Sequence, residues 1–249
     1  MLEVSGLSRR FGGLLAVADV SLRVPAGSIV ALVGPNGAGK TTLFAIISGF
    51  LAPDRGKIVF AGEDVTGLAP HVVSGRGLVR TFQVVQPFGR LSVRENIAVG
   101  AHLRVSERRE ALARAALVAE RVGMSHLIDR PAQTLTVAAR KRLELARALA
   151  TEPRLLLLDE VMAGLNPTEI TEMTRIVRTI RDSGVTVFLI EHVMQAVASL
   201  AERVHVLNHG RLIAEGAPAE IACMPEVVEA YLGHGAARRM AAQIAGSTR

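Results

Sequence analysis

The sequence predicts an α/β fold with a parallel β-sheet at its centre. Three apolar runs, at residues 29–33, 155–158 and 185–190, have the composition of strands that are buried on both faces. A glycine-rich or charged segment follows each run, and parallel strands bring such segments to one edge of a sheet. The 249 residues suffice for one large α/β domain or two small ones with a sizeable core.

Composition narrows the class of protein. Hydrophobic residues make up 49% of the chain, which argues against disorder over most of it. The single cysteine, Cys223, allows no intrachain disulfide, so a reducing compartment is expected. The first residues lack the order of a signal peptide, and no window reaches about 18 uncharged apolar residues. We therefore expect a soluble chain, which can still have a membrane partner.

The net charge of +6 comes almost entirely from arginine, because the only lysines are Lys40, Lys57 and Lys141. A positive balance fits nucleic acid, anionic lipid or a nucleotide ligand. The simplest interpretation is a solvated basic surface, so the position of Lys40 is more informative than the total.

The segment GPNGAGKT, residues 34–41, matches the phosphate-loop pattern at every fixed position and lies between an apolar strand and a helical run. Glycines let the backbone N–H groups surround phosphate oxygens, and the helix start adds positive potential. Lys40 would neutralise the β- and γ-phosphates, and the Thr41 hydroxyl would bind Mg²⁺. A plain glycine-rich turn is the alternative. The residues predicted to bind nucleotide here are Gly34, Pro35, Asn36, Gly37, Ala38, Gly39, Lys40, Thr41 and Thr42.

Two acids end the second strand, in RLLLLDE at residues 154–160. Asp159 is suited to bind Mg²⁺, directly or through water. Glu160 is suited to orient or deprotonate an attacking water molecule. A buried strand that ends in acids by chance is the alternative, and the phosphate loop upstream argues against it.

A helix and a third strand follow. Asn166 can cap a helix whose third position is Glu169, and the helix is expected to end near Asp182. The next strand ends in Glu191 and His192, so the histidine is expected at the same sheet edge as the phosphate loop. An isolated histidine is usually a surface residue, but its place in this order favours a function.

As an ordered set, these motifs resemble the ATP-binding cassette of ABC transporters, over residues 2–232. GPNGAGKT resembles the Walker A loop, and RLLLLDE resembles the Walker B strand with its catalytic glutamate, Glu160. IEH places His192 as the switch histidine, and RTFQ places Gln83 as the glutamine of the Q-loop. Phe11 in RRFGG matches the aromatic residue that stacks on adenine.

The resemblance implies a P-loop NTPase fold of the ABC ATPase type, with a RecA-like core, an antiparallel β subdomain and an inserted α-helical subdomain. It implies a single domain over 1–249. The expected parts are the core with the β subdomain at 1–83 and 152–232, the helical subdomain at 84–151 and a flexible tail at 233–249. Ser92 and Glu95, which can form a capping box, support a helix start in the inserted part.

The resemblance also implies ATP and Mg²⁺ as cofactors and a mechanism of hydrolysis. Two cassettes meet head to tail, and each ATP lies between the Walker A loop of one and the signature motif of the other. The implied catalytic residues are Glu160, His192 and Gln83, and the implied metal ligands are Thr41, Gln83 and Asp159. Gln83 would link the metal and the attacking water to the membrane-facing surface, and His192 would contact the γ-phosphate.

A finer resemblance is to the ATP-binding subunits of branched-chain amino acid importers, in RTFQVVQPFGRLSVRENIAVGAHL, LDEVMAGLNPTE and PEVVEAYLG. It implies an ATPase that powers import of branched-chain or related amino acids. The implied partners are a second cassette, identical or paralogous, transmembrane permease subunits and, indirectly, a solute-binding protein. The implied location is the cytoplasmic side of the inner membrane, and no nucleic-acid partner is expected.

The signature motif departs from the family. In LTVAA, residues 135–139, Thr136 replaces serine, Ala138 replaces the conserved glycine and Ala139 replaces glutamine. Thr136 keeps a hydroxyl for a γ-phosphate across the interface, and the backbone N–H groups of the helix start remain, so we expect weaker binding rather than none. A tolerated variant without consequence is the alternative. The hypothesis is asymmetry, in which a partner supplies the intact signature for the site that hydrolyses ATP rapidly.

Two other functions fit parts of the sequence. A P-loop ATPase acting on DNA fits the charge, but its long coiled coil is missing between Lys40 and Asp159. A regulatory, non-hydrolysing cassette would be expected to lack the carboxylate of Glu160. The tail is expected to be frayed, and Arg238 and Arg239 could contact anionic lipid only if it folds against the membrane.

Overall fold

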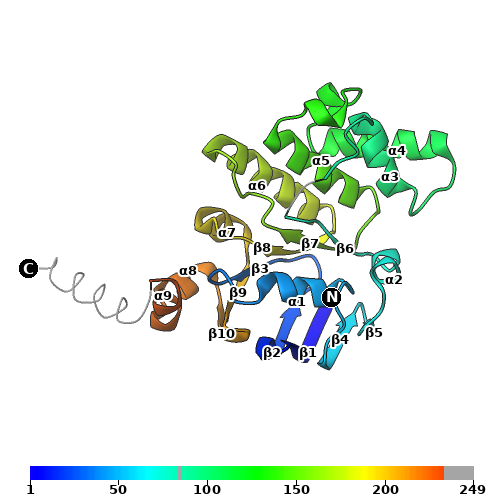
Figure 1. The fold of residues 1–249 in the computed structure, drawn as a ribbon. Helices are drawn as coiled ribbons and strands as arrows, with labels where there is room; N and C mark the ends of the chain where they lie inside the picture. Colours follow the sequence, from blue (N-terminus) through cyan, green and yellow to red (C-terminus); the bar gives the residue numbers. More distant parts are fainter. Residues whose placement is uncertain (84–85, 233–249) are drawn as a thin grey trace, which may run out of the picture.

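The computed structural model describes residues 1–83 and 86–232 of the chain. Its centre is a six-stranded sheet with the strand order β10-β9-β3-β8-β7-β6, shown in Figure 1. All neighbouring strands run parallel except β9 and β10, which form an antiparallel pair. The predicted α/β class with a parallel sheet is confirmed. The strands are β3 (Ile29–Val33), β6 (Leu78–Arg80), β7 (Leu155–Asp159), β8 (Thr186–Ile190), β9 (Arg203–Asn208) and β10 (Arg211–Gly216).

The strand order explains how distant motifs meet. β8 lies between β3 and β7, so the segments that leave all three carboxyl ends emerge side by side. Asp159 is directly opposite Ile190 in this register. The phosphate loop, the two acids and the histidine therefore come to one edge of the sheet.

A second, antiparallel sheet lies below the first in Figure 1, with the strand order β2-β1-β4-β5. The register between its two long strands, β1 and β2, shifts in several places. The antiparallel sheet expected from the resemblance is present. Its strands are β1 (Leu2–Phe11), β2 (Leu14–Val24), β4 (Arg55–Phe60) and β5 (Glu63–Asp64).

Helices cover both faces of the central sheet, and α3, α4 and α5 form a group above it in Figure 1. The capping boxes predicted at Ser92 and Asn166 are both present, at the starts of α3 and α6. The helices are α1 (Lys40–Ile47), α2 (Pro70–Gly75), α3 (Val93–Ala101), α4 (Arg108–Arg121), α5 (Val137–Leu149), α6 (Pro167–Asp182), α7 (Met194–Leu200), α8 (Pro218–Cys223) and α9 (Pro225–Leu232), with 3₁₀ turns at Ser125–Leu127 and Ala132–Thr134.

The group α3–α5 falls within the expected helical subdomain, 84–151, whose boundaries stay a prediction. The expected tail, 233–249, with Arg238 and Arg239, lies outside the described residues. Within residues 1–83 and 86–232, no helix has the length and apolar character needed to cross a membrane.

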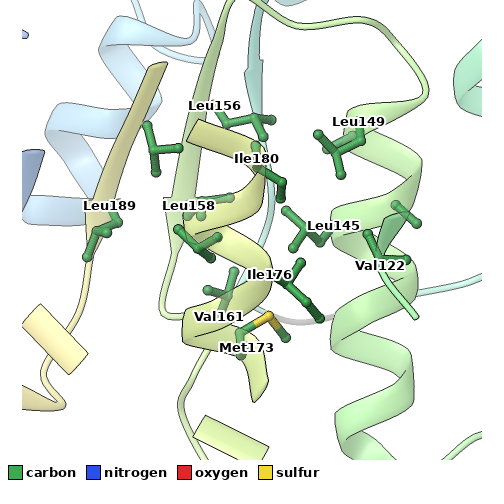
Figure 2. Packing of buried hydrophobic residues seen from close by; sticks show 14 of the residues in the cluster. Val122, Leu145, Leu149, Leu156, Leu158, Val161, Met173, Ile176, Ile180 and Leu189 are labelled. Carbon is green, nitrogen blue, oxygen red and sulfur yellow. The ribbon is translucent and has the colours of Figure 1, made fainter. Parts of the chain in front are cut away.

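The core has two layers, one on each face of the central sheet, because side chains alternate along each strand. On one face, Phe44 of α1 packs against Phe188 of β8, with ring centroids 4.9 Å apart. On the other face, leucines of the sheet meet α5 and α6 (Figure 2). The side chains of this second layer include Leu145, Leu149, Leu156, Leu158, Met173, Ile176, Ile180 and Leu189.

Gly100 sets the distance between α3 and α5. A Cβ added at Gly100 would lie 2.2 Å from the carbonyl oxygen of Arg147 on α5. We expect Gly100→Ala to lower the free energy of unfolding by about 1–3 kcal/mol, because the helices must separate. Urea unfolding of Gly75→Ala is the control, because a Cβ there meets no atom of the described residues within 4 Å. Equal stability of the two variants would contradict the prediction.

Candidate functional site

A pocket of about 760 Å³ opens at the carboxyl edge of the central sheet. It brings together most of the residues that the sequence analysis selected. From the predicted set, its walls contain Phe11, Asn36, Gly37, Ala38, Gly39, Lys40, Thr41, Thr42, Gln83, Glu160 and His192.

The remaining predicted residues lie at three other places. Gly34 and Pro35 begin the loop and bind the Lys40 side chain through their carbonyl oxygens. Asp159 lines an adjoining pocket of about 470 Å³ together with Thr41 and Gln83.

Thr136 and Ala138 line a separate pocket of about 330 Å³ at the start of α5. Within one chain they are not part of the nucleotide pocket.

The shape of the phosphate loop is fixed by backbone packed against it. A Cβ on Gly34 would lie 2.0 Å from the carbonyl oxygen of Leu207 on β9, and one on Gly39 would lie 2.3 Å from that of Ala16 on β2. Both glycines also have positive φ angles, 151° and 103°. These glycines are therefore required by the contact of the loop with both sheets, in addition to the close approach of a phosphate.

Lys40 is buried at the base of the pocket. Its Nζ donates hydrogen bonds to the carbonyl oxygens of Gly34, at 2.7 Å, and Pro35, at 2.9 Å. An ammonium group has three donor protons, so one is left for a phosphate oxygen. Burial lowers the pKa of Lys40, and the negative charges of Glu160 and Asp159 partly offset this.

Asp159 is paired inside the structure with a residue that the sequence analysis did not select. The Nη2 of Arg80, on the neighbouring strand β6, donates to Oδ2 of Asp159 at 2.8 Å, and the two side chains are only 7% and 1% exposed. Oδ1 of Asp159 is buried and has no hydrogen-bond partner among the described residues. This unpartnered carboxylate oxygen and the Thr41 hydroxyl belong to residues that line the same pocket, and both are oxygen donors of the kind that Mg²⁺ prefers.

Glu160 follows Asp159 and points into the nucleotide pocket. Its backbone is left-handed, with φ of 50°, which is a strained conformation for a residue that is not glycine. Its Oε2 accepts a hydrogen bond of 2.6 Å from Nε2 of Gln83. His192 lines the same pocket from the segment after β8. A carboxylate, an amide and an imidazole therefore surround the end of the pocket that faces the phosphate loop.

The opposite end of the pocket suits a flat, apolar group. Phe11, at the end of β1, is 44% exposed, and the guanidinium of Arg9 lies 5.1 Å from its ring centroid. Several wall residues there were not predicted from the sequence, namely Leu14, Leu15, Ala16, His209 and Gly210. His209 and Gly210 lie between two apolar runs, which is a pattern that predicts a turn. Nothing in the sequence indicates that this turn lies near Phe11.

The start of α5 has a capped N-terminus. The Thr136 hydroxyl caps the helix by accepting a hydrogen bond of 3.3 Å from the backbone N–H of Ala139, so its own proton is free to be donated outward. Ala138 is buried, and its methyl group lies where the family pattern has glycine. Val137 beside it is 60% exposed, so an apolar side chain projects from this surface.

The parallel sheet, the lysine-bearing glycine loop and the acids of the neighbouring strand define a P-loop ATPase. Comparison with known proteins identifies which kind. Residues 17–163 match the family model described as ABC transporter, and residues 211–237 match that of the branched-chain amino acid ATP-binding cassette transporter. The chain belongs to the ABC transporter family, as an ATP-binding and ATP-hydrolysing subunit.

Two curated relatives are similar over nearly their whole length. They are the high-affinity branched-chain amino acid transport ATP-binding proteins BraF of Pseudomonas aeruginosa and LivG of Escherichia coli. Each is 41% identical, over 94% of this chain and 98% of the relative. A solved structure of MJ1267, an ATP-binding cassette of an ABC transporter in its ADP conformation, superposes with a TM-score of 0.86. It is 31% identical and covers 94% of this chain and 99% of its own.

Proposed function

We propose that this chain powers the import of branched-chain or related amino acids by binding and hydrolysing ATP. The observation that carries the choice of solute is the similarity over nearly the full chain to BraF and LivG, together with the match of residues 211–237. Because an ATP-binding subunit does not contact the solute, the amino acid itself is chosen by its partners.

In the proposed mechanism, Phe11 stacks on the adenine and residues 34–42 bind the phosphates through backbone N–H groups. The third proton of Lys40 binds a β- or γ-phosphate oxygen. Thr41, Asp159 and Gln83 would hold Mg²⁺, which would neutralise phosphate charge.

Glu160 is the proposed base. Its carboxylate orients an attacking water and accepts its proton, while the amide of Gln83 fixes one carboxylate oxygen through the hydrogen bond of 2.6 Å. His192 donates a hydrogen bond to the γ-phosphate as negative charge grows on it. The two groups follow the ends of adjacent parallel strands, β7 and β8, so the sheet brings them to the same edge.

The partners belong to the same proposal. A second cassette, identical or paralogous, places its signature helix over the ATP, and two permease subunits receive the motion. A solute-binding protein delivers the amino acid to the permease. The subunit then acts as a peripheral protein on the cytoplasmic side of the inner membrane.

The altered signature supports asymmetry between the two ATP sites of such a pair. The site built from this chain's loop and a partner's intact signature hydrolyses ATP rapidly. The site that uses Thr136 and Ala138 of this chain holds ATP more weakly, because the Ala138 methyl crowds a phosphate and Ala139 offers no amide. Equal turnover at both sites of an assembled pair would contradict this proposal.

Solute uptake tests the proposed function. Proteoliposomes would contain this chain, its permease subunits and its solute-binding protein, with ATP enclosed on the side of the ATPase. We expect ATP-dependent uptake of labelled leucine that excess isoleucine or valine suppresses and urea does not. Uptake of glutamine or urea in place of leucine would contradict the solute, and uptake that continues without ATP would contradict the energy source.

A further inference from the structure

Lys141 links the signature helix to the proposed catalytic carboxylate within one chain. It lies in α5, five positions after Thr136, and its side chain crosses the interior to the segment that follows β7. Its Nζ donates a hydrogen bond of 2.8 Å to the backbone carbonyl oxygen of Glu160. Lys141 does not line the nucleotide pocket, so it can affect ATP chemistry only through a neighbour.

The burial of the Lys141 ammonium group is energetically unfavourable by itself. Lys141 is 8% exposed, and burying a cation is unfavourable unless negative groups compensate for the lost water. Burial accordingly lowers the pKa of Lys141, while the negative charges of Glu191 and Glu160 act in the opposite direction. A methionine would fill the same space without this cost.

The hydrogen bond from Lys141 stabilises the strained backbone at Glu160. Glu160 has a left-handed backbone conformation, which persists only where its surroundings hold it. Its N–H donates to the carbonyl oxygen of Ile190 on β8 at 3.0 Å, and its carbonyl oxygen accepts from Lys141. The residue is therefore fixed on one side by the sheet and on the other by the signature helix.

Glu191 holds the next turn of the same segment. It is 1% exposed, and its Oε1 accepts a hydrogen bond of 2.8 Å from the backbone N–H of Met162. Its Oε2 is buried and has no hydrogen-bond partner among the described residues. Burial raises the pKa of Glu191, and the hydrogen bond from Met162 and the positive charge of Lys141 act in the opposite direction. Lys141 and Glu191 thus act on the two ends of the short stretch 160–162, and Glu191 directly precedes His192.

We propose that Lys141 is a positioning residue that holds Glu160 in its strained conformation, so that the orientation of the carboxylate depends on the position of α5. The inference rests on the proposed role of Glu160 as the base. The signature helix would then have two functions. The start of α5 would face the ATP bound by a partner, and its second turn would position the base for the ATP bound by this chain.

The test compares Lys141→Met and Lys141→Arg with a matched control, Lys57→Met, which removes an exposed lysine of β4. ATP turnover is measured in the assembled transporter. The affinity for a fluorescent ATP analogue and urea unfolding are measured on the chain. We expect Lys141→Met to lower kcat about 10- to 100-fold with nucleotide affinity unchanged, as expected for a misplaced base. Lys141→Arg, which keeps the charge, should recover part of the rate.

A double-mutant cycle separates positioning from a general structural effect. In a Glu160→Gln background, Lys141→Met should cause no further loss of residual turnover, because the group that it positions is already gone. The proposal is overturned if Lys141→Met turns over ATP like the wild type, or if its loss is the same in both backgrounds. A loss that appears as weaker nucleotide binding also overturns it. If Glu160→Gln itself leaves turnover unchanged, the proposed base is wrong, which is a different outcome.

Discussion

Glu160→Gln is expected to lower ATP turnover at least about 100-fold, because an amide cannot accept the proton of the attacking water. The amide keeps the size of the side chain and an oxygen that can still accept from Nε2 of Gln83. Nucleotide affinity should therefore remain within a few-fold of the wild type. The matched control is Glu63→Gln, which makes the same change at an exposed position of β5. A variant that keeps more than a tenth of the wild-type rate would contradict the role of Glu160 as base.

The same variant also tests the altered signature, because a cassette that cannot hydrolyse ATP accumulates any closed pair that it can form. With ATP and Mg²⁺, we expect the Glu160→Gln chain to remain monomeric in a measurement of mass in solution. Restoring the family pattern in that background, with Thr136→Ser, Ala138→Gly and Ala139→Gln, should yield a dimer. A dimer of the unrestored variant would show that LTVAA still holds ATP firmly, and the proposed asymmetry would then be wrong.

Lys40→Met is expected to weaken ATP binding by about 10- to 100-fold, the loss that corresponds to one charge-assisted hydrogen bond of about 1.5–3 kcal/mol. Methionine has nearly the length of lysine, so it fills the base of the loop without a donor. The effect should be large for ATP and ADP and small for AMP and adenosine, because Lys40 is proposed to bind the β- and γ-phosphates. Calorimetry with this series of ligands measures the pattern, and circular dichroism confirms the fold. Equal weakening for adenosine would indicate a collapsed loop rather than a lost phosphate contact.

Three of the central strands, β3, β7 and β8, could be predicted to within one residue because each is a continuous apolar run in the sequence. Residues 29–33 and 155–158 are apolar without interruption, and a charged or glycine-rich segment follows each run. The capping boxes at Ser92 and Asn166 could also be predicted, because each depends on residues only three positions apart. The antiparallel sheet followed from resemblance alone, because irregular pairing of β1 with β2 breaks the period of two that identifies a strand.

The parts of the site that sequence reasoning missed depend on contacts between distant segments. Arg80 belongs to RTFQ, in which only Gln83 was predicted to be a site residue. Its ion pair with Asp159 forms because β6 lies beside β7. Lys141 stands inside LTVAARKR, where three other positions were weighed. Its contact with Glu160 depends on how α5 packs on the sheet. In both cases the sequence shows a basic residue, but it does not show which distant residue that side chain contacts.

The phosphate loop connects the two sheets mechanically. The N–H of Gly210 donates to the carbonyl oxygen of Ala38, and the N–H of Ala18 on β2 donates to the carbonyl oxygen of Gly210. Phe11, which is proposed to stack on the base, belongs to the antiparallel sheet, whereas Lys40 follows the central one. If ATP binds as proposed, its two ends contact different sheets, and the nucleotide adds a link between them. ATP binding is therefore expected to make the subunit stiffer than these hydrogen bonds alone make it.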